Sequence, residues 1–381
     1  MKARTILIST AILLILAAGI FVSCDPNWKT WNVTLITNGG TIAPGKEVTQ
    51  YVQGKGAYLP LASEITKEDY TFGGWYDTPD FTGEPVKFIG GTASGDKTFY
   101  AEWIEIQFYF ITEDTQTLEN GKRYTIAEDV TNSNRITVDG KAKLYLPDGY
   151  TLSLTQGITV IGENTLEINS LGEEGTGILD ISDVVSGNAG IGGFSGQSCG
   201  SVIINGGKIV VTGGTDAAGI GGGVRGDGGN ITINGGTVIA TGGFNTGSGA
   251  AAIGGGGRGN GGTIKINGGY VSATGANDAA GIGGGHDGNG ADLRITGGYV
   301  TTSSPAGKGI GGGNSNNGTL TIGDFDIPTE KGHLRIAEGW CLYYGNEENP
   351  HTPCKGPIDT GSYSSYCSPY MDVVYSVEHA E

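Results

Sequence analysis

Apolar and polar residues alternate along much of the chain, with the two-residue period of β-strands. Residues 31–35 read Trp-Asn-Val-Thr-Leu, and residues 230–234 read Asn-Ile-Thr-Ile-Asn. Because successive side chains of a strand point to opposite faces, this alternation predicts strands that bury one face and expose the other. We therefore expect an all-β protein.

The second half of the chain repeats one pattern at a nearly constant interval. Successive Ile-Gly-Gly triplets begin at Ile191, Ile220, Ile253, Ile282 and Ile310. A second series of isoleucines keeps the same period, at Ile204, Ile233, Ile266, Ile295 and Ile322. In both series the second interval is the longest. This agreement indicates a repeat fold with units of about 29 residues.

Each unit fits one coil of a parallel β-helix. Residues 230–234, 237–241 and 250–253 are the expected strands of one unit, and glycine pairs or runs separate them. Isoleucine, valine and alanine would point inward and stack from coil to coil, and glycine permits the tight corners. We expect the β-helix to span residues 105–340. Its opening coils, in residues 105–188, are less rich in glycine, and a solenoid needs such atypical ends to protect a terminal edge.

A separate aromatic-rich segment, residues 31–104, precedes the repeats. A domain of this size needs large side chains to build a core. Its residues 38–40 (Asn-Gly-Gly), Pro60, 72–76 (Phe-Gly-Gly-Trp-Tyr) and 99–103 (Phe-Tyr-Ala-Glu-Trp) resemble the internalin-B-type, or Listeria–Bacteroides, repeat. The resemblance implies a β-grasp-like fold that serves bacterial surface proteins as a spacer or interaction module without catalytic residues. We interpret its aromatic residues as core and not as a sugar-stacking platform.

The repeats carry a resemblance of their own. The pattern Ile-Asn-Gly-Gly-x-Val-x-Ala-Thr-Gly, followed by Ala-Gly-Ile-Gly-Gly-Gly, resembles right-handed β-helices of bacterial surface and carbohydrate-binding proteins. The resemblance implies a right-handed parallel β-helix. Some proteins of that kind bind acidic polysaccharides through calcium held by acidic residues at the corners. Many corners of this chain are glycine instead, as at residues 221–223, so a metal role does not carry over directly.

The N-terminus has the pattern of an export signal. Lys2 and Arg4 precede an apolar run, and Cys24 follows a small residue. This order predicts a signal peptide over residues 1–23, and the small residue before Cys24 resembles the lipobox of bacterial lipoproteins. The resemblance implies that Cys24 is the lipidated first residue of an anchored chain, followed by a linker over residues 24–30. An ordinary signal peptide cleaved nearby and an uncleaved anchor are the alternatives. The expected location is the bacterial cell envelope or surface.

Charge excludes one class of partner. The chain has 22 basic and 39 acidic residues, a net charge of −17, and such a surface repels nucleic acid.

The 73 glycines would suggest disorder or collagen if they were unpatterned, but they follow the repeat and show no strict three-residue period.

Catalytic constellations are sparse in the repeats. A glycosidase needs two carboxylates at a defined separation, and a lyase needs clustered acids with a base. Asp216 and Asp278 lie two units apart with no acid at the matching point between them, and His286 stands alone in a turn, where we expect it to be solvated. We therefore expect no enzymatic activity, and Arg-Gly-Asp at residues 225–227 is interpreted as a product of the glycine-rich repeat.

Binding candidates come from the turns and the exposed aromatics. Calcium binding is one possibility for the turn aspartates, although aspartate is also an ordinary turn former. The candidate calcium ligands are Asp216, Asp227, Asp278, Asp287 and Asp292. The candidate ligand-binding residues are Asp216, Asp278, Phe244, Tyr270 and Tyr299.

Four cysteines besides Cys24 are available for disulfides: Cys199, Cys341, Cys354 and Cys367. Three of them lie in residues 341–381, which we expect to be a C-terminal cap or tail that a disulfide could fasten. The pairing stays open. No Cys-x-x-Cys spacing indicates zinc.

Three functional hypotheses follow. The first is a cell-surface adhesion or carbohydrate-binding module that contacts a polysaccharide or a host or cell-surface protein. The second is a purely structural stalk or envelope protein. The third, a polysaccharide lyase or hydrolase, has the least support because no groove of converging carboxylates is indicated.

Overall fold

The computed structural model describes residues 29–67, 70–182, 184–245 and 248–323, together with five strand segments between residues 334 and 375. Within these residues the protein is all-β, as the sequence predicts. The described part contains no helix of the length and apolarity needed to span a membrane. Contacts divide the chain into two units between Gln107 and Phe108.

The first unit is built on one mixed sheet. Its strand order is β3-β1-β8-β6, with β1 and β8 parallel and the other neighbours antiparallel. Two short antiparallel pairs, β2 with β5 and β4 with β7, lie outside this sheet. The strands are β1 (Thr30–Ile36), β2 (Thr41–Ile42), β3 (Gln50–Val52), β4 (Ala57–Tyr58), β5 (Ile65–Thr66), β6 (Tyr70–Tyr76), β7 (Phe88–Ile89) and β8 (Lys97–Glu105).

Aromatic side chains form much of the core of this unit. Trp75 is only 1% exposed, and its indole Nε1 donates to the carbonyl of Pro60 at 2.9 Å. Phe72 packs edge-on against both Trp75 and Trp103, with ring centroids 5.5 and 5.4 Å apart. The interpretation of these aromatics as core residues is therefore confirmed, and their burial supplies the apolar area that a small domain needs.

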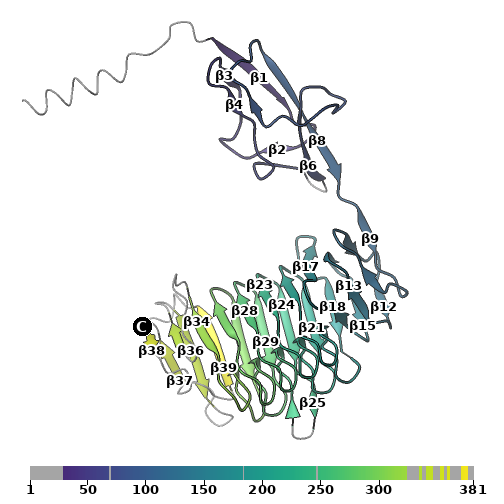
Figure 1. Ribbon diagram of the computed structural model, residues 1–381, viewed down its shortest axis with the longest axis vertical. Coiled ribbons are helices and arrows are strands. Elements are labelled where there is room, and N and C mark those ends of the chain that lie inside the picture. Colours follow the sequence, from purple (N-terminus) through teal and green to yellow (C-terminus); the bar gives the residue numbers. More distant parts are fainter. Residues whose placement is uncertain are drawn as a thin grey trace, which may run out of the picture. The chain divides into compact units, whose positions relative to one another are not determined.

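The second unit is a parallel β-helix with three long sheets, visible as the ladder of arrows in Figure 1. Sheet 1 contains β9 (Phe108–Phe110), β11 (Arg123–Thr125), β14 (Lys141–Pro147), β17 (Thr165–Leu171), β20 (Ser201–Ile204), β23 (Asn230–Ile233), β28 (Thr263–Ile266), β31 (Asp292–Ile295), β34 (Thr319–Ile322), β35 (Leu334–Ile336) and β38 (Ile358–Thr360).

The other two sheets complete each coil. Sheet 2 contains β12 (Val130–Asn132), β15 (Thr151–Leu154), β18 (Ile178–Ile181), β21 (Lys208–Thr212), β24 (Thr237–Thr241), β29 (Tyr270–Thr274), β32 (Tyr299–Ser303), β39 (Tyr370–Tyr375), β36 (Trp340–Gly345) and β37 (Thr352–Lys355). Sheet 3 contains β10 (Thr117–Leu118), β13 (Ile136–Val138), β16 (Ile158–Thr159), β19 (Ile191–Gly192), β22 (Ile220–Gly221), β27 (Ile253–Gly254), β30 (Ile282–Gly283) and β33 (Ile310–Gly311).

The register of sheet 1 reproduces the period found in the sequence. Its successive paired positions are Ser201, Asn230, Thr263, Asp292 and Thr319. The predicted parallel β-helix and its three strands per coil are confirmed. The opening coils have other lengths, because the coil from Lys141 to its partner Thr165 is shorter than the later coils and the coil from Thr165 to Ser201 is longer.

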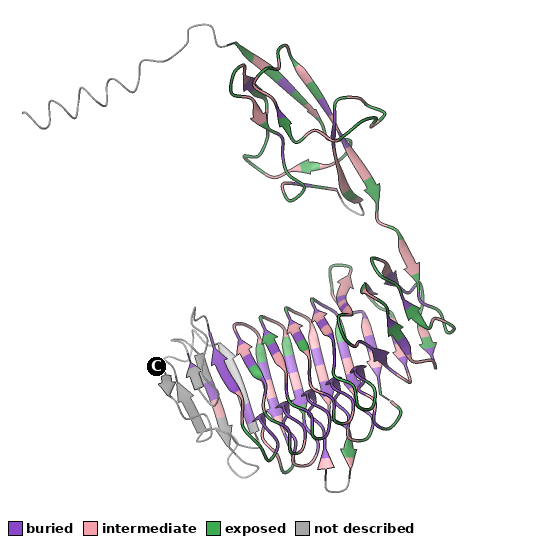
Figure 2. Cartoon of the chain, viewed as in Figure 1, coloured by how far each residue is buried: buried purple, intermediate pink, exposed green. Residues whose placement is uncertain are grey.

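The interior of the solenoid is a stack of aliphatic side chains. Figure 2 shows buried residues alternating with partly buried or exposed ones along the strands. The inward residues of sheet 1 are fully buried, as at Ile204, Ile233, Ile266, Ile295 and Ile322. Each such side chain contributes roughly 1.5–3 kcal/mol of burial free energy, so the aligned columns supply much of the solenoid's stability.

Backbone geometry explains why glycine follows isoleucine in each Ile-Gly-Gly triplet. The first glycine of each triplet has φ between 133° and 143°, a region that residues with a Cβ rarely adopt. These glycines are Gly192, Gly221, Gly254, Gly283 and Gly311. In the first four, a Cβ would also overlap the carbonyl oxygen of the glycine in the next coil.

The C-terminal strands reverse direction on the stack. Strand β39 pairs antiparallel with β32, and β36 pairs antiparallel with β39 and with β37. In sheet 1, β38 pairs antiparallel with β35. The row of parallel strands in sheet 2 therefore does not end on β32 as an open edge, which is the usual hazard of a solenoid end.

Candidate functional site

A hairpin interrupts the regular coils at the third Ile-Gly-Gly unit. Asn267 follows Asn234 at a separation of 33, whereas Asn234 follows Asn205 at a separation of 29, so one coil is longer than its neighbour. Within the longer coil, β25 (Phe244–Asn245) pairs antiparallel with β26 (Ser248–Gly249). The extra residues thus form a small projection between sheets 2 and 3.

Asp216 lies beside this hairpin and is held by it. Its Oδ2 accepts a hydrogen bond from Asn245 Nδ2 at 2.6 Å, and its Oδ1 accepts one from Ser248 Oγ at 2.8 Å. The backbone of Asp216 has φ of 59°, the left-handed conformation that aspartate tolerates better than most residues. Both carboxylate oxygens are therefore used by donors of the next coil.

A cleft of about 240 Å³ opens between this hairpin and the turns after sheet 3. Its lining residues are Asp216, Val224, Arg225, Asn245, Ser248, Gly257 and Arg258. Arg225 and Arg258 occupy equivalent turns of successive coils, and the amide of Arg225 donates to the carbonyl of Gly257 at 2.8 Å. Their φ angles are 64° and 70°. The cleft therefore brings two cations, one carboxylate and two neutral polar groups together.

The second aspartate of the expected pair has different neighbours. Asp278 is two coils from Asp216, and its Oδ2 lies 3.9 Å from His286 Nδ1. His286 Nε2 lies 3.3 Å from Asp287 Oδ2. The His286 side chain is only 17% exposed and its Nδ1 is buried, so the expectation of a solvated histidine was wrong. No acid lies between Asp216 and Asp278 at this position, because Gly249 is the equivalent residue of the intervening coil.

A larger groove runs along three coils at the turn between sheets 3 and 1. It has a volume of about 520 Å³, and its polar lining includes Asn260, Asn289, Asp292, Asn316 and Thr319. Thr319 Oγ1 donates to Asp292 Oδ1 at 2.6 Å. The groove's side chains come from equivalent positions of successive coils, so hydrogen-bonding groups repeat along it at the rung spacing of about 4.8 Å.

One wall of this groove is an asparagine ladder. Asn289 Nδ2 donates to Asn260 Oδ1 at 2.9 Å, and Asn260 Nδ2 donates to Asp227 Oδ1 at 3.0 Å. The backbone amide of Asn260 donates to the same Asp227 oxygen at 2.7 Å. Asp227, a candidate calcium ligand, is therefore the first residue of this ladder. It is also the aspartate of the Arg-Gly-Asp triplet, and its Oδ1 accepts hydrogen bonds within the protein.

A second ladder lies at the turn between sheets 1 and 2. Asn234 Nδ2 donates to Asn205 Oδ1 at 2.7 Å, and Asn267 Nδ2 donates to Asn234 Oδ1 at 2.8 Å. Thr296 Oγ1 continues it by donating to Asn267 Oδ1 at 2.9 Å. Each of these bonds contributes about 1 kcal/mol and ties one coil to the next.

The candidate aromatics are exposed but differ in arrangement. Tyr270 and Tyr299 are paired in register, and their rings stack at 5.5 Å with an angle of 7°, so each covers one face of the other. They are 43% and 39% exposed. Phe244, on the inserted hairpin, is 60% exposed. Of the three, Phe244 is the closest in sequence to the cleft, next to Asn245.

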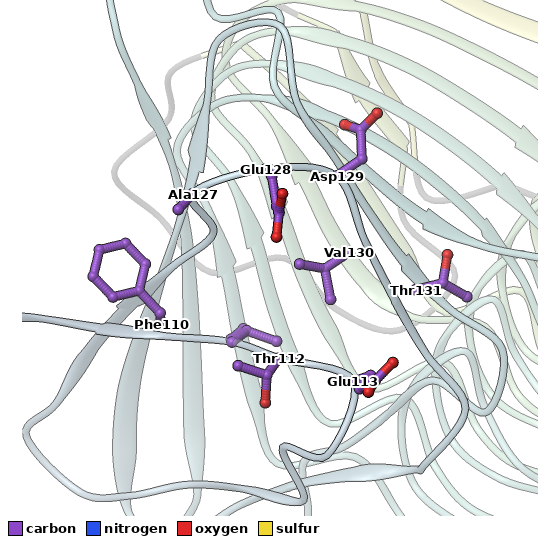
Figure 3. A pocket seen from close by; sticks show the side chains of 9 residues that line it. Phe110, Thr112, Glu113, Ala127, Glu128, Asp129, Val130 and Thr131 are labelled. Atoms are coloured by element: carbon purple, nitrogen blue, oxygen red, sulfur yellow. The ribbon is translucent and has the colours of Figure 1, made fainter.

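A notch of about 410 Å³ marks the first coil. The chain runs from β9 in sheet 1 to β10 in sheet 3 without a strand in sheet 2, so β12 is the first strand of that sheet. Figure 3 shows the lining, which combines the ring of Phe110 with the carboxylates of Glu113, Glu128 and Asp129. Asp129 Oδ1 accepts the amide of Thr151 at 2.7 Å.

No group of three or more histidine, cysteine, aspartate or glutamate side chains suited to a metal ion is present among the described residues. The candidate calcium ligands are accordingly distributed over separate places. Asp216 is in the cleft, Asp227 starts a ladder, Asp292 lines the groove, and Asp278 and Asp287 flank His286.

The cysteines fall into three groups. Cys199 is a free thiol in the solenoid core, only 6% exposed, and burial raises its pKa to about 12. Cys24 and Cys367 lie outside the described residues. Cys341 and Cys354 belong to β36 and β37, whose pairing places Leu342 opposite Cys354, but the side chains of both cysteines lie outside the described part.

Sequence reasoning missed Arg225, Arg258, Asn245 and Ser248 as residues that meet in one cleft. The signal was the longer interval between Ile220 and Ile253, because an insertion between two anchors must leave the regular coil. The asparagine ladders had a signal too, since Asn205, Asn234 and Asn267 each precede Gly-Gly at the repeat period.

The comparisons with known protein families separate the same two parts. Residues 31–102 match the Listeria-Bacteroides repeat domain. Residues 202–224, 231–257 and 264–286 match the β-helix repeat. The resemblance to the Listeria-Bacteroides repeat and the resemblance to β-helix proteins are thus both confirmed. No curated protein and no solved structure gives a significant match. A Listeria-Bacteroides repeat domain followed by β-helix repeats indicates a surface or structural protein.

Proposed function

We propose that this protein is a cell-surface lipoprotein that binds a polysaccharide along its β-helix and does not catalyse a reaction. The groove over three coils supports this proposal most directly. Within about 520 Å³ it is lined by the amides of Asn289 and Asn316 and by the carboxylate of Asp292, whose Oδ1 already accepts the hydroxyl of Thr319. Sugar hydroxyls both donate and accept hydrogen bonds, and a mixed row of such groups satisfies both needs.

The repetition of the groove suits a polymer better than a single small molecule. Equivalent side chains recur on successive coils, so neighbouring sugars of one chain can make similar contacts. Weak contacts made by linked units reinforce one another, because each further contact is intramolecular. The expected role is therefore adhesion, with a glycan-bearing surface as the partner.

We further propose that this binding does not require calcium. Calcium takes six to eight oxygen ligands, usually from several carboxylates around one point. Here Asp216 accepts two hydrogen bonds from protein side chains, and Asp227 and Asp292 each accept at least one. These carboxylates are used to fasten turns and coils, as aspartate commonly is.

The remaining parts have supporting roles in this proposal. Cys24 would carry the lipid that holds the chain at the membrane. The Listeria-Bacteroides repeat domain would act as a spacer, since the aromatic residues of its family pattern are used in its core: Trp75 is buried and Trp103 Nε1 donates to the carbonyl of Thr37 at 2.7 Å.

A purely structural stalk is the second candidate, and one observation favours it. The amides of the ladder, Asn205, Asn234 and Asn267, hydrogen-bond to one another. The rings of Tyr270 and Tyr299 likewise stack on each other. Such ladders stabilise a solenoid without any ligand. A stalk would need no groove, so the two candidates differ in whether Asn289 contributes to binding.

A comparison of two asparagine variants tests the proposal. The full chain, purified in detergent, is sedimented with a panel of insoluble polysaccharides, and Asn289→Ala is compared with Asn234→Ala. Both variants remove one ladder amide, but only Asn289 lines the groove. We expect Asn289→Ala to weaken binding about tenfold, the effect of one lost hydrogen bond, and Asn234→Ala to retain it. Binding that is absent in the unmodified chain, or that is equal in both variants, would overturn the proposal.

A further inference from the structure

The cleft beside the inserted hairpin contains two arginines that the groove does not use. Arg225 and Arg258 both line it, and both are exposed. Neither guanidinium makes a hydrogen bond or ion pair with any residue that the structure describes. The carboxylate in the cleft lining, that of Asp216, accepts hydrogen bonds from Asn245 and Ser248.

Two cations that have no partner among the described residues lie on adjacent coils here. The chain has 39 acidic residues against 22 basic ones, so an arginine has many possible partners. Placing two guanidinium groups on adjacent coils costs repulsion, since their backbones are one rung apart, about 4.8 Å. An anion between them would remove that repulsion and use their free donors.

The backbone at these positions also has a cost. Arg225 and Arg258 have φ of 64° and 70°, where a side chain with a Cβ is disfavoured by roughly 1–2 kcal/mol. Glycine fills many of the surrounding corner positions, but it does not fill these two. Asp287, at the equivalent turn of the next coil, also has a positive φ, of 59°, so this conformation belongs to the turn and does not by itself mark a site.

The charge of this corner reverses along the solenoid. One coil beyond Arg258, the equivalent turn carries Asp287, which lies 3.3 Å from the Nε2 of His286. Asp278, the equivalent of Asp216, is next to the same histidine. The positive charge is therefore confined to the coils on either side of the hairpin, as expected for a local site and not for a generally basic surface.

We propose that this cleft binds the anionic group of an acidic sugar, a carboxylate or a sulfate, between Arg225 and Arg258. The planar guanidinium fork matches both groups through paired N–H donors. The cleft volume of about 240 Å³ equals that of about eight water molecules, enough for one sugar residue. Asn245 and Ser248, at the cleft wall, offer polar atoms to its hydroxyls. The sugar part rests on the proposed function, whereas the anion site rests on the arginines alone.

The test uses the full chain in detergent and three soluble probes: oligogalacturonate for the carboxylate, dextran sulfate for the sulfate and dextran as the uncharged control. Binding is measured by calorimetry at about 0.15 M salt, which screens long-range attraction. We expect at least one anionic probe to bind more tightly than dextran. The probe that binds identifies the anionic group.

Variants separate the cleft from general charge. Arg225→Gln and Arg258→Gln should each weaken binding of the anionic probe roughly tenfold or more, the effect of losing a charged hydrogen bond. The matched control is Lys208→Gln with Lys265→Gln, which removes two exposed positive charges from sheets 2 and 1. The control should bind as the unmodified chain does, and circular dichroism should show that all variants are folded.

Two results would overturn the proposal: weakening by the lysine double variant equal to that by either arginine variant, or no preference for either anionic probe over dextran. The outcome is independent of the asparagine groove. If Asn289→Ala leaves glycan binding unchanged while arginine-dependent binding of an anionic probe persists, the proposed groove is wrong and the anion site stands.

Discussion

Gly221 of one coil pairs in register with Gly254 of the next, and a Cβ added to Gly221 would overlap the carbonyl oxygen of Gly254. The same relation recurs between Gly192 and Gly221 and between Gly254 and Gly283. The repeat is thus maintained by contact between backbones. Side chains are excluded at this corner because the coils approach each other too closely.

Gly221→Ala should be strongly destabilising. Its φ of 141° lies where alanine is strained, and the new methyl group has no space. We expect a loss of roughly 3 kcal/mol or more from strain and overpacking together, measured as a lower melting temperature. Gly162→Ala is the control, since Gly162 has φ of 63° and nothing within 4 Å of the added Cβ, and it should cost only about 1 kcal/mol. Equal losses would contradict the account of the triplet.

Asp148 should make part of the stability depend on pH. Its carboxylate accepts the backbone amides of Glu174 at 2.9 Å and Thr176 at 2.7 Å, and these hydrogen bonds hold the pKa of Asp148 below its usual value. A carboxylate with a lowered pKa in the folded state stabilises the fold above its usual pKa, and that stabilisation is lost as the pH falls through the lowered value.

The comparison of Asp148→Asn with the unmodified chain measures this effect. The variant should have a lower melting temperature at pH 7, and the difference should shrink as the pH falls below about 4. Asp114→Asn, at an exposed carboxylate that has no hydrogen bond or ion pair within the described part of the chain, should show no such pH-dependent difference. A difference for Asp148→Asn that stays constant down to pH 2 would contradict the prediction.

The thiol of Cys199 should be unreactive in the folded protein. Burial raises its pKa to about 12, and thiolate is the reactive form. At pH 8 iodoacetamide should not modify Cys199 in the folded chain, and it should do so once the chain is denatured. Mass spectrometry of the Cys199 peptide distinguishes the two. Rapid modification without denaturant, or a disulfide at Cys199, would show that the thiol is not a buried free one.

The lipid anchor predicts a simple change of location. If Cys24 carries lipid, Cys24→Ser should abolish labelling by a radioactive fatty acid in a bacterial host and shift the protein from the membrane to the soluble fraction. Cys199→Ser serves as the control and should keep the label. Membrane retention without labelling in the unmodified chain would favour an uncleaved apolar segment instead.

The repeat made the β-helix predictable from the sequence. Two isoleucine series with the same period are expected when equivalent residues of successive coils stack on one another. Ile204 and Ile233 do pair in register. The resemblance of residues 72–76 and 99–103 to a known repeat predicted the first domain. Local pattern was sufficient here because each coil uses the same inward and corner positions.

The candidate sites were harder to predict from the sequence than the fold. The sequence named Asp216 and Phe244, but it did not indicate that Asn245 and Ser248 bond to Asp216 across coils. That contact depends on where the inserted hairpin folds back, which no periodicity specifies. His286 was misjudged for a similar reason, because its burial comes from the stacking of neighbouring turns and not from its own segment.

The most direct test of polysaccharide binding is a glycan array probed with the full chain in detergent, once with calcium and once with a chelator. We predict binding to one group of glycans in both conditions. Binding that disappears with the chelator would contradict the calcium-independent site and return attention to the turn aspartates. Failure to bind any glycan in either condition would contradict the central claim and favour the structural stalk.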